Sequence, residues 1–404
     1  MSEPRKPLLS LDDALAALLA AVGPLGRGES VSTFDALGRV LAADVVSQLD
    51  VPPADNTAMD GYALRAADVA PGRVLSVSQR IPAGSVPVAL VPGTAARIFT
   101  GAQIPAGADS VVMQEDCEAV DGGGVRVKGE VRLGQHIRRR GEDVQQGATV
   151  LAAGARLNAA SLGLAASVGA AWLQVAVRPR VALFSTGDEL VMPGEPLKPG
   201  AIYNSNRFTL RGLLQALGCE VVDLGIVPDK LDATRAALRE AAARADLIVT
   251  SGGVSVGEED HLRPAVQAEG RLDLWQIALK PGKPLAFGQV AEAFFIGLPG
   301  NPVSSLVTFL MLVRPVILRL QGAAVLAPRR YGMRADFHWP KPDRRREFLR
   351  ARINEAGGLD LFPNQSSGVL TSAVWGDGLV DNPPGQAIAA GDVVQFIPFT
   401  ELLA

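Results

Sequence analysis

Short apolar runs alternate with amphipathic segments between residues 178 and 320, and this rhythm limits the possible folds more than any other feature of the chain. The apolar runs are rich in β-branched residues, as buried strands are. In the segment that begins near Ser205, leucines recur three, four and seven residues after Leu210, and Gly218 ends the pattern, as in an amphipathic helix. Strands that alternate with helices predict a doubly wound, mostly parallel α/β sheet.

The pattern predicts both the strands and the helices of this region. The strands are expected at residues 181–185, 221–227, 247–250, 274–279 and 293–296. The helices are expected at residues 205–217, 231–244, 261–268 and 303–320. Asp229 stands just before the second helix and can cap it, and Asn301 with Pro302 can begin the last one.

The rest of the chain predicts three further units. Ser10 can cap an N-terminal helix whose apolar stripe runs from Leu11 to Val22. Between about residues 51 and 141, short β-branched runs alternate with Gly and Pro turns, which is typical of a small β-rich unit. We expect the N-terminal helix to meet the segment of residues 149–177, so that the β-rich unit is an insertion. Short strands at residues 348–353, 368–374 and 393–397 predict a terminal β-barrel or sandwich.

These observations divide the chain into four domains. We expect a discontinuous N-terminal domain (residues 1–50 and 145–178), an inserted β-rich domain (51–144), the doubly wound domain (179–325) and a C-terminal β-barrel (326–404). The hydrophobic share of 48% supplies enough apolar side chains for packed cores and rules out disorder as the main state.

Charge and cysteine usage exclude several classes of protein. With 39 Lys and Arg against 42 Asp and Glu, the formal charge of −3 argues against a protein that binds nucleic acid through its bulk charge. Cys117 and Cys219 stand far apart in no metal-ligand spacing, which favours reduced thiols in a cytoplasmic protein. The three histidines form no HExxH pattern, so the sequence argues against histidine-based metal chemistry.

No segment is expected to cross a membrane. Asp12 and Asp13 interrupt the N-terminal apolar stretch, where a secretory signal would be uncharged. The uncharged run at 157–177 is mostly Ala, Gly and Ser, and the run at 293–313 is broken by the Pro-Gly-Asn-Pro sequence that begins at Pro299. We therefore expect a soluble, cytoplasmic protein.

Charged and glycine-rich loops follow the expected strands of the α/β region. In an open parallel sheet, ligands bind beyond the carboxyl ends of the strands, so these loops should meet at one edge. In chain order they are TGDEL (186–190), Asp229, TSGGVSVGEED (250–260), KPGKP (280–284) and LPGNPVSS (298–305). Glycine turns that lead into helices, together with lysines, suit an anion such as phosphate. Carboxylates in the same cleft would repel phosphate unless Mg²⁺ lay between them, so the combination predicts an Mg²⁺-bound phosphate or pyrophosphate ester.

Each loop taken alone also has a structural interpretation. TGDEL and Asp229 could cap helices, the glycine pair at Gly252 could be a tight turn, and the two lysines could lie in a solvated loop. Neither the GxGxxG nor the GxxxxGK[ST] nucleotide fingerprint is present. Only the convergence of the loops on one edge favours a functional site. In the β-rich unit, Asp60 and the Thr100-Gly101 pair lie in dense polar patches that turn chemistry alone could explain.

Seven motifs occur in order along the chain: NTAMDGYA, FTGAQIPAGADSVV, GEDV, FSTGDEL, SGGVSVGEEDH, KPGKPLAFG and GLPGNPVSS. Together they closely resemble the molybdopterin molybdenumtransferase (MoeA) family, which includes the E domain of gephyrin. The resemblance covers essentially the whole chain and is looser beyond about residue 328. It implies an elongated homodimer with a discontinuous N-terminal domain, an inserted β domain, a doubly wound domain of the molybdopterin-binding type and a C-terminal β-barrel.

The resemblance implies the last step of molybdenum cofactor synthesis. Such enzymes insert molybdenum from molybdate into adenylylated molybdopterin and release AMP, with Mg²⁺ as the usual cation. The cleft would lie between the doubly wound domain of one subunit and the inserted domain of the other. A transient contact with the adenylyltransferase that supplies the substrate is also implied, whereas nucleic acid and membranes are not expected partners. The pterin supplies the sulfur ligands of the metal, so no residue is expected to act as a covalent nucleophile.

The loops and the resemblance together give the expected site residues. Catalytic roles are expected for Asp60, Thr100, Glu189, Asp229 and Asp260. The carboxylates expected to bind Mg²⁺ are Asp188, Glu189, Asp229 and Asp260. Substrate binding is expected from Asp188, Gly252, Gly253, Ser255, Lys280, Lys283, Pro299, Asn301, Pro302, Ser304, Arg350, Ser366 and Ser367.

Two alternative functions stay open at this point. Single-domain proteins with a similar doubly wound fold adenylylate molybdopterin, but the inserted domain and the barrel favour the insertion enzyme. A scaffold that binds a peptide, as the E domain of gephyrin does in animals, is the other alternative. The full set of carboxylates and lysines argues against a purely structural role.

Overall fold

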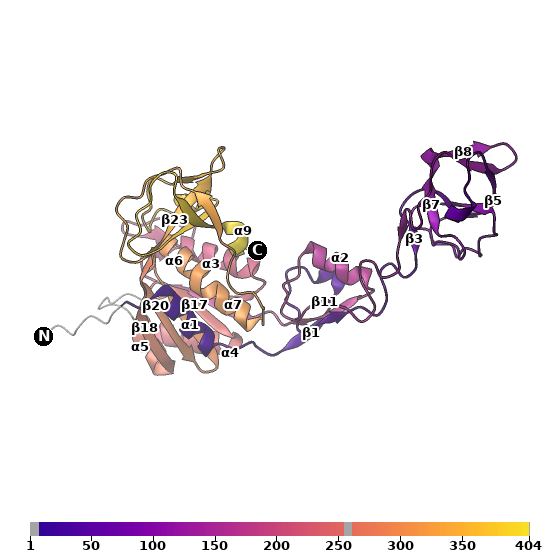
Figure 1. Ribbon diagram of the computed structural model, residues 1–404. Coiled ribbons are helices and arrows are strands. Elements are labelled where there is room, and N and C mark those ends of the chain that lie inside the picture. The colour runs from indigo at the N-terminus through magenta and orange to yellow at the C-terminus, as the bar shows by residue number, and fades with distance from the viewer. Residues whose placement is uncertain (1–7, 254–260, 404) are drawn as a thin grey trace.

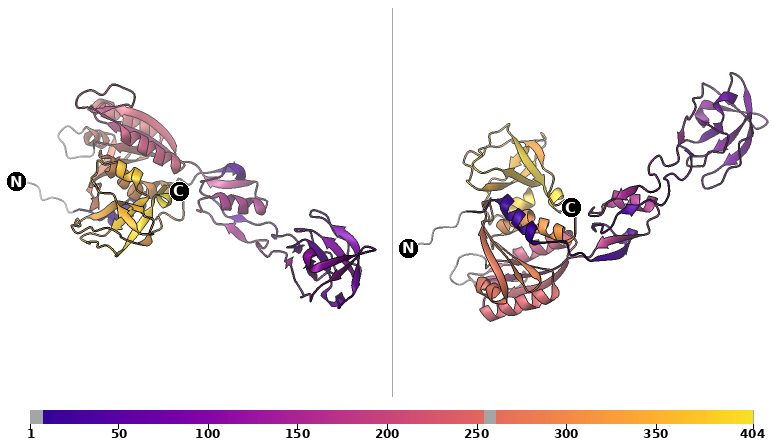
Figure 2. Two further views of the ribbon diagram at one scale, coloured as in Figure 1. Left: turned by 90° about the horizontal axis from the view of Figure 1, so that it is seen from above. Right: turned by 60° about the horizontal axis from the view of Figure 1, so that its bottom comes forward.

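The computed structural model describes residues 8–253 and 261–403 and has an elongated shape. A large lobe holds the α/β domain and the C-terminal domain, as Figure 1 shows. A small middle unit leads away from this lobe and ends in a separate β-rich unit at the far tip, which lies well apart from the lobe in all three views (Figures 1 and 2).

A sheet of six strands forms the centre of the large lobe. Its order is β16 (Glu220–Val227), β13 (Arg180–Thr186), β17 (Leu247–Ser251), β21 (Ala293–Leu298), β20 (Pro284–Val290) and β18 (Gly270–Gln276). The first four strands are parallel, and β20 is antiparallel to both of its neighbours. The prediction of a doubly wound, mostly parallel sheet is confirmed.

Helices cover both faces of this sheet because side chains alternate along its strands. Leu183 packs with α1 (Leu11–Ala21), α3 (Ser205–Ala216), α6 (Pro302–Thr308) and α7 (Arg314–Leu320). Phe184, the next residue, packs with α4 (Leu231–Arg244) and α5 (Leu262–Glu269) on the other face. A π-helical turn, η4 (Phe309–Val313), joins α6 to α7.

The segment between α5 and β21 differs from the prediction of a single strand at residues 274–279. It forms an antiparallel pair of β18 and β20, and a short strand β19 (Leu279–Lys280) lies between them in sequence. β19 leaves the central sheet and pairs with the C-terminal domain. The apolar run of β20 directly follows the KPGKP loop, and the sequence pattern did not separate the strand from that loop.

The N-terminal helix α1 packs on the α/β domain, so the expectation that it meets the segment of residues 149–177 is wrong. Leu11, Ala14 and Leu18 are buried in the same core as α3 and α7. The chain that follows the helix does meet that segment through β1. The helical stretch Pro302–Leu320 is long and apolar enough to span a membrane by length and composition, but 89% of its most apolar 18 residues are buried inside the protein, as in a core helix.

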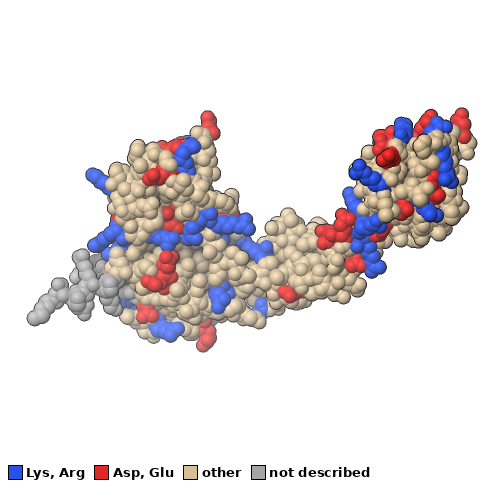
Figure 3. Space-filling view, viewed as in Figure 1, with Lys and Arg blue, Asp and Glu red and all other residues tan. Residues whose placement is uncertain are grey.

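The middle unit is built from two separate parts of the chain. Its paired strands are β1 (Gly28–Ser32) with β12 (Trp172–Ala176) and β2 (Val45–Val46) with β11 (Thr149–Leu151). Helix α2 (Ala159–Ser167) and the 3₁₀ turn η1 (Thr33–Asp35) pack beside them. Figure 3 shows few charged side chains on the face of this unit that is in view, between two more highly charged ends.

The tip is the β-rich unit that the Gly and Pro turns predicted. Its sheet runs β7 (Ser110–Met113), β4 (Gly61–Leu64), β6 (Thr94–Ile98), β5 (Val74–Ile81), β9 (Gly124–Val127) and β8 (Cys117–Val120). The 3₁₀ turns η2 (Ala66–Asp68) and η3 (Gln114–Asp116) lie within it, and β3 (Asn56–Thr57) pairs with β10 (Ile137–Arg138).

The C-terminal domain is a β structure that shares its core with the α/β domain through Phe348, Leu379 and Ile397. Its sheet runs β19, β23 (Arg346–Ile353), β25 (Gly378–Asn382), β26 (Val393–Pro398) and β22 (Tyr331–Arg334), with β24 (Leu359–Leu361) on β23. The predicted strand at 368–374 is wrong: a loop leads there into the short helix α8 (Thr371–Trp375). The helix α9 (Phe399–Leu403) ends the described chain.

Candidate active site

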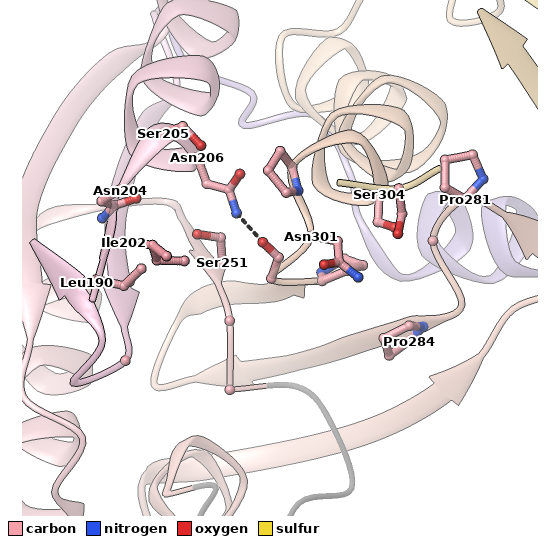
Figure 4. Close-up of a pocket in the computed structure, with 18 of the residues that line it drawn as sticks. Leu190, Ile202, Asn204, Ser205, Asn206, Ser251, Pro281, Pro284, Asn301 and Ser304 are labelled. Atoms are coloured by element: carbon pink, nitrogen blue, oxygen red, sulfur yellow. Dashed lines mark hydrogen bonds between the residues drawn. The ribbon is translucent and has the colours of Figure 1, made fainter. Parts of the chain in front are cut away.

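A cavity of about 750 Å³ lies at the carboxyl ends of β13, β17 and β21, the edge where the sequence placed the site. In Figure 4, Leu190, Ile202 and Asn204 lie on one side of it and Pro281 and Ser304 on the other, with Ser251 and Asn301 between them. The strand order explains these two sides, because the loops after β13 and β16 lie at one end of the edge and the connection from β19 to β20 lies at the other.

Two carboxylates form what we call the acidic wall, Glu189 and Asp229. Glu189 is exposed, and Asp229 is half-buried. The Asp229 N–H donates to Oδ1 of Asp188 at 3.2 Å, so the loops after β13 and β16 are joined at this point. Neither loop caps a helix. β14 (Leu190–Val191), not a helix, follows TGDEL and pairs with β15 (Ile202–Tyr203). α4 begins at Leu231, and its N-cap residue is Lys230, which forms no side-chain cap.

Glycine geometry holds the backbone of the acidic wall in place. Gly252 has φ of +90°, and a Cβ built on it would lie 2.9 Å from the carbonyl oxygen of Thr186. Its N–H donates to the Leu298 carbonyl at 3.1 Å, so the ends of β13, β17 and β21 approach one another at this residue. At Gly187, φ is +144° and the Glu189 carboxylate folds back to within 2.5 Å of the Cβ position. A side chain at either position would displace the wall.

Three cations form the opposite side, which we call the basic wall: Lys280, Lys283 and Arg345. Lys280 Nζ contacts Glu347 at 3.0 Å and Asp343 at 3.4 Å. Arg345 donates two hydrogen bonds to Asp343, from Nε to Oδ1 at 3.0 Å and from Nη2 to Oδ2 at 2.9 Å. These hydrogen bonds hold the pKa of Asp343 well below its usual range and raise that of Arg345. Lys283 is exposed and forms no ion pair within residues 8–253 and 261–403.

Polar groups between the two walls complete the lining. Ser304 is buried at 5% exposure in the first turn of α6. Asn206 Nδ2 donates to the Gly300 carbonyl at 2.7 Å and fixes the turn before α6 (Figure 4). The Ser367 carbonyl accepts the Val303 N–H at 2.9 Å, which holds the C-terminal loop against the same helix. Asn204 is 2% exposed, and its buried Nδ2 finds no acceptor among the described residues.

The cavity brings together most of the residues that sequence analysis selected. Those that line it are Glu189, Asp229, Gly252, Gly253, Lys280, Lys283, Pro299, Asn301, Pro302, Ser304, Ser366 and Ser367. Asp188 is in contact with Asp229 but is exposed and does not line the cavity. Ser255 and Asp260 lie outside the described residues.

Arg350 differs from its expected position, because it is 1% exposed and lies behind the cavity. Its guanidinium donates to Ser372 Oγ at 3.0 Å and to the carbonyls of Phe348 and Ser366 at 3.1 and 3.3 Å. Burial lowers its pKa to about 10. Arg350 therefore supports the loop that carries Ser366, and the arginine that reaches the cavity is Arg345, five residues earlier.

Asp60 and Thr100 lie in the unit at the far tip, away from this cavity (Figures 1 and 2). Oδ1 of Asp60 accepts hydrogen bonds from the Thr100 backbone N–H at 2.7 Å and from its hydroxyl at 2.8 Å. Both bonds lower the pKa of Asp60, so the group stays ionised at neutral pH. The structure therefore joins these two predicted residues to each other but not to the cavity of the same chain.

Sequence analysis missed several lining residues, among them Arg345, Gln365 and residues 204–206 at the start of α3. Helix α3 follows β13, so its first residues must lie at the carboxyl edge of the sheet. The predicted order of strand and helix could therefore have placed them in the site. Arg345 lies within a run of three arginines, and nothing in that run indicates which side chain faces the cavity.

Comparison with known proteins gives the class of this molecule. A model of the MoeA N-terminal region (domains I and II) matches residues 9–169, a probable molybdopterin binding domain matches 182–319, and the MoeA C-terminal region (domain IV) matches 333–399. The crystal structure of a molybdopterin biosynthesis MoeA protein from Pyrococcus horikoshii superposes with a TM-score of 0.84 at 29% identity, over 97% of this chain and 100% of that one. The fold is therefore the multidomain MoeA architecture around a domain of the molybdopterin-binding type.

Full-length relatives identify the family. The molybdopterin molybdenumtransferase of Haemophilus influenzae is 40% identical over 98% of this chain and 100% of its own length. Molybdopterin molybdenumtransferase 2 of Mycobacterium tuberculosis is 38% identical over 94% of this chain and 96% of its own length. The chain belongs to the molybdopterin molybdenumtransferase family, and the resemblance that the seven motifs indicated is confirmed.

Proposed function

We propose that this protein catalyses the last step of molybdenum cofactor synthesis. It inserts molybdenum from molybdate into adenylylated molybdopterin and releases AMP. The observation that carries the proposal is one cavity with an acidic and a basic wall at the edge of the molybdopterin-binding-type domain. Two reactants that both carry negative charge require cations and N–H donors, and a pyrophosphate beside carboxylates requires a metal ion between them.

The basic wall binds the anionic reactants. Lys280 and Arg345 present donors from fixed positions, and the exposed Lys283 adds mobile positive charge. Ser304, with Ser366 and Ser367 of the C-terminal loop, supplies hydroxyl donors nearby. Molybdate is a dianion with four oxygen acceptors, so it matches a wall of several converging donors.

Mg²⁺ binds at the acidic wall in this proposal. Within residues 8–253 and 261–403 no cluster of three or more metal-ligating side chains is present, so those residues form no complete cage. Glu189 and Asp229, with Asp188 beside them, nevertheless suit Mg²⁺, which takes one or two carboxylates and completes its shell with water and phosphate oxygens. The bound ion would polarise the pyrophosphate so that AMP leaves more easily.

Neither cysteine is suited to act as a nucleophile or a metal ligand. Burial raises the pKa of Cys117 to about 11 and that of Cys219 to about 12, so both stay protonated thiols at neutral pH. Neither residue lines the cavity. The sulfur ligands of molybdenum come from the pterin substrate, and the protein's task is to bind and orient two anions.

A homodimer with a shared cleft accounts for Asp60 and Thr100. The middle unit carries the tip far from its own cavity, which leaves the tip able to reach the cavity of a partner subunit (Figures 1 and 2). Phe34, Leu37 and Trp172 of the middle unit are 93%, 61% and 66% exposed, and such a surface suits burial against a second copy. In this proposal the protein acts in a cytoplasmic pathway and makes a transient contact with the adenylyltransferase that supplies its substrate.

Complementation between subunits tests this dimer. Asp60→Asn and Glu189→Gln each inactivate a homodimer, but a mixed dimer of the two variants keeps one intact site. Co-expressed and co-purified mixed dimers should recover about a quarter to a half of the wild-type activity, because one of two composite sites is whole. Mixed dimers as inactive as their parents, or a monomer in light scattering, would contradict the shared cleft.

The reaction itself distinguishes the candidate functions. Purified protein supplied with adenylylated molybdopterin, molybdate and Mg²⁺ should release AMP and yield cofactor that activates a molybdenum-dependent apoenzyme. AMP transfer from ATP to molybdopterin without a partner protein would instead identify an adenylyltransferase. Cofactor formation unaffected by alanine at Asp60 or Asp229 would favour a scaffold.

A further inference from the structure

We propose that Glu347, a buried residue outside the cavity lining, is a positioning residue for Lys280 and thereby sets the affinity for molybdate. The inference rests on the proposed function, in which Lys280 binds an anionic reactant. It adds a residue that neither touches the substrate nor follows from any motif of the sequence.

Strand register places Glu347 beside Lys280. β19 pairs in parallel with β23, and Lys280 lies opposite Glu347 in that pair. On the other side of β23, Glu347 lies opposite Asn382 of β25. Side chains in register project from the same face of a sheet, so the three residues form a row across three strands. The lysine comes from the α/β domain, and its two neighbours in the row come from the C-terminal domain.

The Glu347 carboxylate is fully buried, with 0% exposure, and donors surround it. Oε1 accepts from Lys280 Nζ at 3.0 Å. Oε2 accepts from Trp339 Nε1 at 2.9 Å, from the Asp343 N–H at 3.1 Å and from Asn382 Nδ2 at 3.4 Å. Four donors from separate parts of the chain leave the carboxylate one position, and the Lys280 ammonium is held from that fixed point.

Stability alone gives a weak reason for a charged group at this position. Replacing a buried ion pair by packed apolar side chains is often neutral or favourable, because the pair must be desolvated. Lys280 is only partly buried, with 36% of its side chain exposed toward the cavity. A buried anchor beneath a partly exposed cation is the arrangement expected where a long, flexible side chain must be held in a single rotamer for a ligand.

The anchor also changes what the wall offers to an anion. Lys280 and Arg345 carry two positive charges, and Glu347 and Asp343 carry two negative charges directly behind them. At Lys280 and Arg345, molybdate therefore meets oriented N–H donors with little excess charge, and Lys283 supplies the unpaired charge of the wall. Oriented donors favour recognition of the shape of the anion, and the small excess charge allows it to leave during turnover.

A double-mutant cycle tests the inference. Glu347→Ala and Lys280→Ala, alone and together, are assayed for the KM of molybdate, the KM of adenylylated molybdopterin and kcat, and molybdate binding is measured separately by calorimetry. Glu347→Ala should raise the molybdate KM and Kd about tenfold, the equivalent of one charge-assisted hydrogen bond, and change the pterin KM less than about twofold. In the Lys280→Ala background it should have no further effect.

Two further variants separate positioning from folding. Glu347→Gln keeps the size of the side chain but has only one acceptor oxygen, which suits the three donors on the Oε2 side and leaves an NH2 facing Lys280. It should therefore raise the molybdate KM as Glu347→Ala does, with a smaller loss of melting temperature. Asp381→Asn removes another buried carboxylate of the same sheet, one that pairs with Arg330 and Arg346 and does not line the cavity. It should lower the melting temperature as Glu347→Ala does but leave the molybdate KM unchanged.

The outcomes discriminate between the two proposals. An additive effect of Glu347→Ala in the Lys280→Ala background, or an equal rise in KM from Asp381→Asn, overturns the inference and leaves the function intact. A molybdate KM unchanged in Lys280→Ala overturns both the assignment of Lys280 and the inference that depends on it.

Discussion

The two walls of the cavity are built in different ways. In the acidic wall, glycines and hydrogen bonds from backbone N–H groups fix the loops, and the carboxylates of Glu189 and Asp229 project from them with little support from other side chains of the described residues. In the basic wall, Lys280 and Arg345 are held by two acidic side chains, Glu347 and Asp343. The acidic wall can therefore adapt to a metal ion and its waters, whereas the basic wall presents donors at fixed positions.

The largest expected effect is on the acidic wall. Asp229→Asn and Glu189→Gln should each lower kcat for molybdenum insertion about a hundredfold, because each removes a charge that would bind the cation. Neither side chain has a buried partner within residues 8–253 and 261–403, so the melting temperature should change by no more than about 2 °C. Activity and thermal melts of the purified variants measure both effects.

Glu195→Gln serves as the matched control for these carboxylates. Glu195 is exposed in the same loop region as Glu189 and does not line the cavity, so its variant should keep wild-type activity. Equal losses of activity in Glu195→Gln and in the two wall variants would show that activity depends on the charge of the loop in general and not on the acidic wall.

The contrast between the walls also explains what could be predicted from the sequence. The acidic wall comes from short contiguous motifs that follow strands, such as TGDEL and the glycine pair at Gly252, and the rule that such loops share an edge placed them correctly. The basic wall depends on the pairing of residues 280 and 347, which are 67 positions apart. No local pattern indicates that pairing. The expectation of Arg350 rested on the looser C-terminal part of the family resemblance, whereas Arg345 lines the cavity.

The fold shows the same difference between features that follow from the local sequence and features that depend on distant contacts. The helix at Leu231–Arg244 was predicted at its observed bounds from its amphipathic pattern, although the expected cap by Asp229 does not form. The packing of α1 on the α/β domain was not predicted. An apolar stripe indicates that a helix is buried but does not indicate which surface it packs against. The β20 strand was missed because the prolines and glycine that precede it read as a continuous loop.

Gly252 tests whether the acidic wall depends on its backbone. Gly252→Ala places a Cβ 2.9 Å from the Thr186 carbonyl at a φ of +90°, so it should cost about 1–3 kcal/mol of unfolding free energy and lower kcat as the loop shifts. Gly200→Ala is the control, because its φ is +85° and no atom lies within 4 Å of the new Cβ. Denaturant melts that rank the control as the more damaging change would contradict this role of the backbone.

Lys283 provides a contrast within the basic wall, since it lines the cavity but forms no ion pair with a described residue. Lys283→Ala should raise the KM of both anionic substrates about threefold to fivefold, less than the loss of a positioned donor. The effect should shrink as salt is added, because an exposed charge is screened. Lys341→Ala, an exposed lysine outside the lining, should leave both constants unchanged at every salt concentration.

The smallest effect expected is a dependence of stability on pH at the basic wall. Hydrogen bonds from Arg345 lower the pKa of Asp343 in the folded protein below its usual value of 3.8. A carboxyl whose folded pKa is depressed stabilises the protein above its unfolded pKa, and that contribution is lost as the pH falls through the folded value. Asp343→Asn should therefore melt a few degrees below the wild type at pH 7, and the gap should narrow below about pH 4. A gap that widens on acidification would mean that the ionised carboxylate does not support this wall, and the contrast with the acidic wall would then rest on Glu347 alone.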